Sequence, residues 1–139
     1  MAWWAWALVS AGSAALVSIL AKVGMEKIPS DLATAIRTIV ILLFAWALVF
    51  LRGEAAHLGQ ISRRGLLFLV LSGLGTGVSW LAYFRALQLG PASRVAPIDK
   101  LSLVFTAVLA VALLGESWSA RYALGLALVM AGVLLTTFA

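Results

Sequence analysis

Five long apolar stretches alternate with short polar connections along the chain. Each stretch has about the length of a helix that crosses a bilayer, since ~20 residues at ~1.5 Å per residue span a hydrocarbon core of ~30 Å. The pattern therefore predicts an all-α integral membrane protein in which residues 1–139 form one domain of five transmembrane helices. The expected spans are residues 2–21, 32–51, 65–87, 94–114 and 121–138.

The composition favours lipid over water as the main solvent. Of the 139 residues, 64% are hydrophobic and 11% are charged, and a soluble domain of this size has too much surface to hide so many apolar side chains. The net charge of +5 would suggest a nucleic-acid partner in a soluble protein. Here the basic residues stand singly or in pairs between apolar runs, as at membrane faces, so no nucleic-acid partner is expected.

Asp99 and Lys100 lie side by side in the fourth apolar stretch, close to Pro97. Charges inside hydrocarbon are costly and normally line a cavity or a pathway. A helix that starts near Ser93 would place both charges about two turns inside the bilayer, with Pro97 as a hinge. A helix that starts at Pro97 would place them in its first turn, where Asp99 would complement the helix dipole.

The length of the fourth span favours the earlier start, because residues 98–114 alone are at the short limit for a crossing. Neighbouring residues on a helix point ~100° apart. Asp99 and Lys100 are therefore expected to face different partners, on other helices or on another subunit.

Arg37 is the one charge within the second stretch. Its long stem can carry the guanidinium to the headgroups, or the side chain can face inward and meet an anion on a solute or on Asp99. Trp80 and Tyr83 form either an interfacial aromatic belt or the lining of a cavity mouth. The candidate solute and coupling residues are Arg37, Trp80, Tyr83, Asp99 and Lys100.

Two glycine pairs mark helix faces that are suited to close packing. Gly73 and Gly77 are four residues apart, and Gly125 and Gly132 are seven apart, so each pair lies on one face. Small residues let helices approach closely in lipid, so we expect these four to pack against other helices. A nucleotide-binding loop is excluded at Gly73, because no strand precedes it.

The residues needed for catalysis or metal binding do not occur together. The chain has no cysteine, which excludes disulfides and thiolate metal sites. Glu54 and His57 are spaced like metal ligands, but no third ligand stands nearby. No nucleophile, base and orienting group can be combined, so we expect no enzymatic activity, no metal and no cofactor.

Basic residues are balanced between the two faces of the predicted membrane domain. Five spans put the chain ends on opposite sides of the membrane. Four basic residues flank each membrane face; if Arg85 lies inside its helix, one face has three. The positive-inside rule needs a bias to orient a chain. We therefore expect insertion in both orientations and an antiparallel homodimer, an arrangement that inverted repeats create within one chain. The two groups are Lys22, Lys27, Arg85 and Arg94, and Arg52, Arg63, Arg64 and Arg121.

One segment resembles the second half of an EamA domain, the repeat unit of the drug/metabolite transporter superfamily. It runs from Tyr83 to Ser93, YFRALQLGPAS, and is followed by an apolar helix that ends in Leu113-Leu114-Gly115-Glu116. The five-helix plan, the Pro29 turn before the second helix and Arg37 also resemble this family. The similarity therefore covers essentially the whole chain.

The resemblance implies a secondary transporter, often an exporter of metabolites such as amino acids, that works by alternating access. Most relatives carry two such domains as inverted repeats in one longer chain, so a single domain implies a homodimer. The related small multidrug exporters use a glutamate in the first helix, whereas residues 2–21 contain no acid here. Many relatives carry a proline further along the fourth helix, about where this chain has Leu103.

Two functions follow as expectations. The first is a transporter in the bacterial inner membrane whose cavity holds two basic residues and one acid and accepts zwitterionic or anionic solutes. Asp99 is its candidate for proton coupling, because apolar surroundings favour the neutral carboxyl group. The alternative is a non-transporting membrane subunit that assembles with or stabilises another membrane protein.

Overall fold

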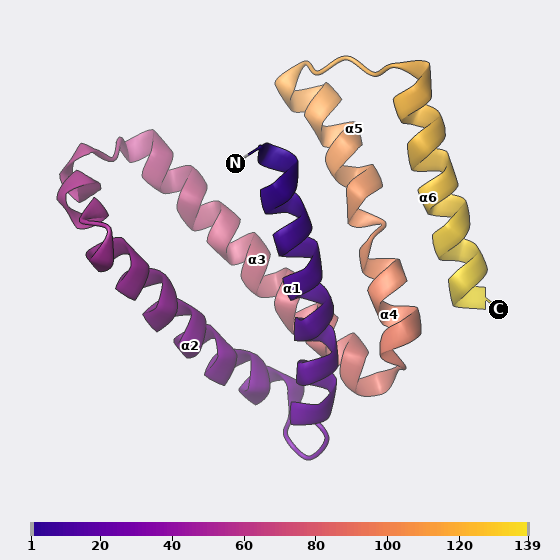
Figure 1. The fold of residues 1–139 in the computed structure, drawn as a ribbon, viewed down its shortest axis with the longest axis horizontal. Helices are drawn as coiled ribbons and strands as arrows, with labels where there is room; N and C mark the ends of the chain where they lie inside the picture. The colour runs from indigo at the N-terminus through magenta and orange to yellow at the C-terminus, as the bar shows by residue number, and fades with distance from the viewer. Residues whose placement is uncertain (1, 139) are drawn as a thin grey trace. The chain divides into compact units, whose positions relative to one another are not determined.

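The computed structural model describes residues 2–138, which form helices joined by short connections (Figure 1). Five helical stretches among these residues are long and apolar enough to cross a membrane, and α4 and α5 together make one of them. No strand occurs in this described part, so the predicted all-α membrane fold with five spans is confirmed. The elements are α1 (Trp3–Gly24), α2 (Ser30–Leu51), η1 (Glu54–Gln60), α3 (Arg63–Leu89), α4 (Ala92–Asp99), α5 (Ser102–Leu114) and α6 (Ala120–Phe138).

The chain divides into two compact units, each of which is described by itself. Leu20–Gln88 form the middle unit, which holds the end of α1 together with α2, η1 and α3. The described residues up to Ile19 and those from Leu89 onward form the terminal unit, which holds most of α1 together with α4, α5 and α6.

Local sequence signals set the helix ends of the middle unit. Pro29, with an extended ψ of 137°, precedes α2, and Asp31 in the first turn complements the helix dipole. Gly53 is left-handed, with φ 70°, and turns the chain into η1, so the connection expected as a polar loop contains a short 3-10 helix. The Ser62 hydroxyl accepts a hydrogen bond from the N–H of Gly65 at 3.0 Å, which caps the start of α3.

The buried core of the middle unit lies where the end of α1, the start of α2 and the end of α3 meet. Lys22 Nζ donates a hydrogen bond to the Leu87 carbonyl, and Gln88 Nε2 donates one to the Ile28 carbonyl at 2.9 Å. The last carbonyls of a helix have no partner within the helix. The bond from Lys22 therefore satisfies the end of α3 while tying it to α1. The residues buried in this core are Ala21, Met25, Ser30, Ala33, Thr34, Phe84 and Leu87.

In the terminal unit, α6 packs against both α4 and α5. Ala107 of α5 and Val133 of α6 are the buried apolar residues of these helices. Gly115 is left-handed, with φ 68°, and its N–H donates to the Val111 carbonyl at 3.2 Å. A left-handed glycine is a common helix end, so α5 stops where the sequence predicts.

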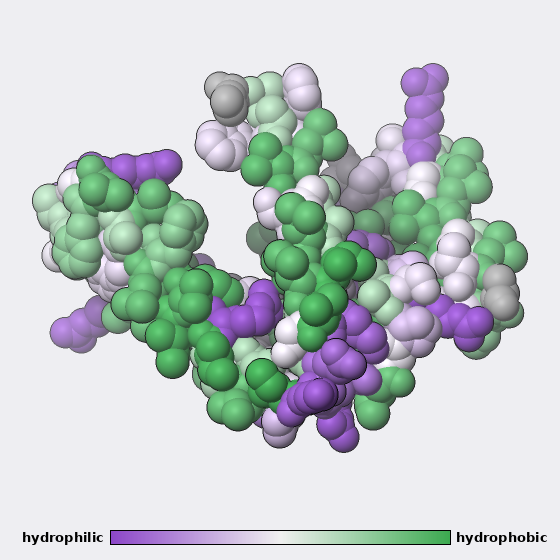
Figure 2. Space-filling model, turned by 60° about the horizontal axis from the view of Figure 1, so that its bottom comes forward, coloured by the Kyte–Doolittle hydropathy of each residue, from purple (hydrophilic) through white to green (hydrophobic). Residues whose placement is uncertain are grey.

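Most apolar side chains of the spanning helices are exposed at the surface of the single chain. Phe84 is 2% exposed, whereas Leu51 and Leu113 are 82% and 76% exposed. Figure 2 shows hydrophobic residues over much of the visible surface, interrupted by a few hydrophilic groups. Apolar area left in water costs about 25 cal/mol per Å². These faces therefore need lipid or a protein partner to cover them.

Candidate functional site

The Arg37 side chain reaches from α2 to two aromatic rings of α3. Its guanidinium carbon lies 4.1 Å from the ring centroid of Phe84 and 5.9 Å from that of Trp80. Such a contact gains about 0.5–2 kcal/mol, depending on desolvation. Arg37 Nη1 is buried, and no described residue accepts a hydrogen bond from it. A buried donor without an acceptor costs about 1–3 kcal/mol, and more when charged. Arg37 therefore has unused capacity for an anion.

A groove of about 470 Å³ lies between α2 and α3. Trp80, whose ring lies next to the Arg37 guanidinium, is one of the residues that line this groove. Small-molecule sites commonly measure ~300–1,000 Å³. The residues from α2 follow the spacing i, i+3, i+4, i+7 and i+8, which places them on one helix face. The groove is lined by Asp31, Thr34, Ala35, Thr38 and Ile39 from α2, and by Gly73, Thr76, Gly77, Trp80 and Leu81 from α3.

Three threonine hydroxyls supply polar atoms to this largely apolar groove. Thr34 and Thr38 donate to the carbonyls of Ser30 and Thr34, each at 2.8 Å, and Thr76 donates to the carbonyl of Ser72 at 3.0 Å. Each hydroxyl proton is therefore used within its own helix. The oxygen lone pairs remain as acceptors, so the groove combines apolar walls with a few acceptor atoms.

The glycines singled out for close packing have open space beside them. Apart from the two chain neighbours and the backbone of its own helix, no described atom would lie within 4 Å of a Cβ built on Gly73, Gly77, Gly125 or Gly132. Their role in helix packing stays a prediction. Within the middle unit, Gly73 and Gly77 line the groove.

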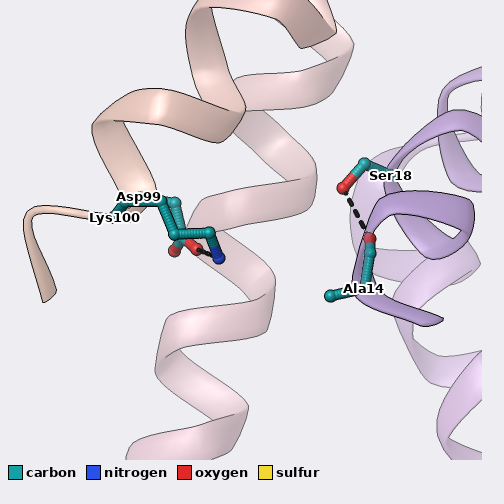
Figure 3. Close-up of polar contacts among 4 residues, drawn as sticks. All are labelled: Ala14, Ser18, Asp99 and Lys100. Carbon is teal, nitrogen blue, oxygen red and sulfur yellow. Dashed lines mark hydrogen bonds and ion pairs between the residues drawn. The ribbon is translucent and has the colours of Figure 1, made fainter. Parts of the chain in front are cut away.

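Asp99 and Lys100 pair with each other in the terminal unit (Figure 3). Lys100 Nζ lies 3.3 Å from Asp99 Oδ2, and the side chains are 54% and 37% exposed, respectively. The expectation that these neighbours would face different partners is therefore wrong. Lys100 directly follows the end of α4, and its flexible four-carbon stem brings the ammonium back to the carboxylate.

The fourth span starts early and is interrupted just beyond its proline. α4 begins at Ala92, close to the earlier of the two predicted starts, and contains Pro97. The α-helix is lost at Lys100 and Leu101 before α5 begins. There the N–H groups of Lys100, Leu101 and Leu103 donate to carbonyls three residues back, at 2.9–3.0 Å, which is a tighter turn than the α-helix. The role of Pro97 as a hinge stays a prediction.

The structure brings together some of the predicted site residues. Arg37 and Trp80 meet in the middle unit, and Tyr83 packs edge-on against Phe84 with ring centroids 5.5 Å apart. The acid–base pair belongs to the terminal unit. Sequence reasoning missed Phe84, because an apolar ring in an apolar span looks like any other. Its position four residues after Trp80, on the same helix face, is the one signal that pointed to it.

Glu54 and His57, the spaced pair of possible metal ligands, both lie in η1. Positions three apart in a 3-10 helix project in the same direction. Within residues 2–138, however, no three His, Asp or Glu side chains are grouped so that they could hold a metal ion.

The apolar spans define an integral membrane protein, and within its middle unit a buried cation, Arg37, lies next to a largely apolar groove. The EamA-like transporter family matches residues 1–138, so the chain belongs to that family. A protein of Sinorhizobium sp named "Uncharacterized transporter in cobO 3'region" is 53% identical over 133 residues, which are 96% of this chain and 94% of that protein. No solved structure matches the chain. The resemblance inferred from the sequence is thus confirmed, and the family points to transport rather than to an enzymatic reaction.

Proposed function

We propose that this protein is a secondary transporter of the bacterial inner membrane that exports small zwitterionic or anionic metabolites, such as amino acids. It works by alternating access as an antiparallel homodimer. The observation that carries the proposal is Arg37, a cation in a spanning helix whose buried Nη1 has no acceptor among the described residues. Ionisable side chains within spans normally serve a pathway. In a family of transporters, the solute itself is the natural source of the missing acceptor.

A second copy in the opposite orientation completes the transport path. Four basic residues flank each predicted face, so the chain has no bias that would fix one orientation. The face of α6 that carries Gly125 and Gly132 has open space beside it, which suits close packing against another subunit. Inverted repeats place their substrate sites at the repeat interface near the bilayer midplane, and an antiparallel homodimer would do the same.

Asp99 and Lys100 supply the coupling step of this proposal. In the chain without solute they neutralise each other across 3.3 Å. A zwitterionic solute replaces this pairing by placing its ammonium on Asp99. A protonated Asp99 no longer attracts the ammonium, so proton binding and solute binding oppose each other. Such competition exchanges protons for solute and allows a proton gradient to drive export.

Transport by the purified protein in liposomes tests the proposal. The wild type is expected to exchange radiolabelled amino acids or small carboxylates against a proton gradient. Asp99→Asn is expected to lose gradient-driven flux and to bind zwitterionic solutes more weakly, because the amide, like the protonated acid, no longer attracts an ammonium group. Glu116→Gln is the matched control and should keep full flux, because Glu116 is exposed in the connection between α5 and α6.

Two results would contradict the proposal in different ways. Gradient-driven flux in Asp99→Asn equal to that of the wild type would remove Asp99 from the coupling step. A wild type that moves no solute, but copurifies in a fixed ratio with another membrane protein, would favour the non-transporting subunit instead.

A further inference from the structure

We propose that Phe84 is a positioning residue for Arg37. Its ring holds the guanidinium inside the middle unit through a cation–π contact, whereas a buried charge normally has an oppositely charged partner. The N–H groups of Arg37 therefore stay available to an anionic solute. The inference rests on the proposed transport function and deepens it, because it assigns the residue that keeps the solute-binding cation in place.

The contact with Phe84 is the closer of the two that Arg37 makes with rings of α3. The guanidinium carbon lies 4.1 Å from the Phe84 centroid and 5.9 Å from the Trp80 centroid. The face of an aromatic ring attracts a cation electrostatically, but it does not take up a pair of N–H groups as a carboxylate does. A ring can therefore fix the position of a guanidinium and leave its donors unpaired. Arg37 Nη1 is in this state, since it is buried and has no acceptor among the described residues.

The Phe84 ring is itself a fixed platform. It is 2% exposed, and two hydrogen bonds secure the end of α3 just beyond it. Lys22 Nζ donates to the Leu87 carbonyl, and Gln88 Nε2 donates to the Ile28 carbonyl. Both bonds join this end of α3 to residues that precede α2. The flexible partner of the contact is the arginine stem, so the ring determines where the guanidinium rests.

Without the ring, the Arg37 side chain has another place to go. Arg37 lies seven residues after Ser30, the first residue of α2, which is about 10 Å along the helix axis. Side chains on a helix point back toward its N-terminus, and a long arginine stem carries its charge to the membrane interface when nothing holds it. A guanidinium at the interface is hydrated and binds a solute less tightly. The ring therefore raises the affinity for an anion by preventing this movement.

Fluorinated phenylalanines at position 84 test the ring with little change in its shape. One, two or three fluorines withdraw electron density from the ring face, so the attraction for a cation weakens in steps. The same series at Phe68 is the matched control. The Phe68 ring lies near the start of the same helix, 5.9 Å from the guanidinium carbon of Arg64, and the proposal gives this contact no role in solute binding.

Acetate is the anionic probe, and acetamide is its uncharged counterpart. Each protein is purified with isotope-labelled arginine in an uncharged maltoside detergent, so that no headgroup phosphate competes, and NMR follows the arginine side chains during the titration. Arg37→Lys identifies the Arg37 signal by its loss. Acetate, and not acetamide, should shift this signal in the wild type. The affinity for acetate should fall with each added fluorine at position 84, by about 3–30-fold in total, and should not change in the Phe68 series.

Phe84→Leu should lose as much affinity as the most fluorinated ring, because it keeps an apolar side chain and removes the aromatic face. An affinity that stays constant or rises along the Phe84 series would overturn the inference. So would equal losses in the Phe68 series, or an Arg37 signal that does not respond to acetate in the wild type. A stepwise loss in a protein that moves no solute in liposomes would refute the transport function alone. Transport with no effect of fluorination on affinity would refute the positioning role alone.

Discussion

Arg37 and Lys100 are both cations within spanning stretches, yet they have different partners in the two units of the molecule. Arg37 lies over two aromatic rings of the middle unit, and its buried Nη1 has no acceptor among the described residues. Lys100 in the terminal unit is paired with the adjacent Asp99 at 3.3 Å. One cation is therefore open to an anion from outside the chain, and the other is already neutralised. Arg37 should accordingly govern solute affinity, and Lys100 should contribute more to stability.

The largest expected effect is that of Arg37→Gln on solute affinity. A hydrogen bond to a charged group is worth about 1.5–3 kcal/mol, so the variant should bind the transported carboxylate solute about 10–100-fold more weakly than the wild type. Isothermal titration calorimetry on the purified protein measures this loss. Arg37→Lys should give an intermediate affinity, because it keeps the charge without the bidentate geometry.

Arg52→Gln is the control for general loss of positive charge, since Arg52 is exposed directly after α2. It should bind with wild-type affinity. Equal losses for Arg37→Gln and Arg52→Gln would mean that the orphaned Nη1 has no special role, and the contrast with Lys100 would disappear.

Lys100→Met should lower stability more clearly than affinity, because it leaves Asp99 without its partner. The two side chains are 54% and 37% exposed, so the expected loss in the free energy of unfolding is about 1 kcal/mol. The Asp99→Asn/Lys100→Met double variant should regain most of that loss. Thermal unfolding of the wild type, the two single variants Asp99→Asn and Lys100→Met, and the double variant in detergent measures the coupling. A drop in solute affinity for Lys100→Met that exceeds the drop for Arg37→Gln would reverse the proposed division of roles.

Lys22 adds a third case to the comparison of Arg37 with Lys100, because its ammonium group has a backbone carbonyl as its hydrogen-bond acceptor. Its Nζ donates to the Leu87 carbonyl at the end of α3. Lys22→Met should lower the free energy of unfolding by about 1 kcal/mol or slightly less, the usual net value of one hydrogen bond, and should leave solute affinity unchanged. Lys27→Met, at an exposed position in the connection between α1 and α2, is the control in the same unfolding assay. An equal loss in both variants would argue against the bond to Leu87.

The spans were predictable because the length of an apolar run directly reports the length of a membrane-crossing helix. Their ends were less predictable. α1 continues to Gly24 and α3 reaches Leu89, since polar residues extend a helix beyond its apolar run when their side chains find partners, as Lys22 does. The interruption at Lys100 and Leu101 depends on backbone hydrogen bonds three residues apart, which no residue type at those positions announces.

The candidate site was only partly predictable for a related reason. Arg37 stood out as a charge in an apolar span, and its contact with Trp80 joins two residues that the sequence had singled out separately. The groove itself could not be derived from the sequence, because a groove forms where the side chains of two neighbouring helices leave space unfilled. Its position depends on the alignment of α2 against α3, which hydropathy does not specify. Gly73 and Gly77 were visible as a pair, but the same spacing also suits helix packing.

Topology of the C-terminus tests the central claim, an antiparallel homodimer, most directly. One fusion carries alkaline phosphatase, which is active only outside the cytoplasm, and a second carries green fluorescent protein, which fluoresces only inside. The balance of four basic residues on each face predicts substantial signal from both fusions, and two arginines added next to one face should shift the chain to a single orientation. Signal from only one fusion of the unmodified chain would contradict the antiparallel homodimer.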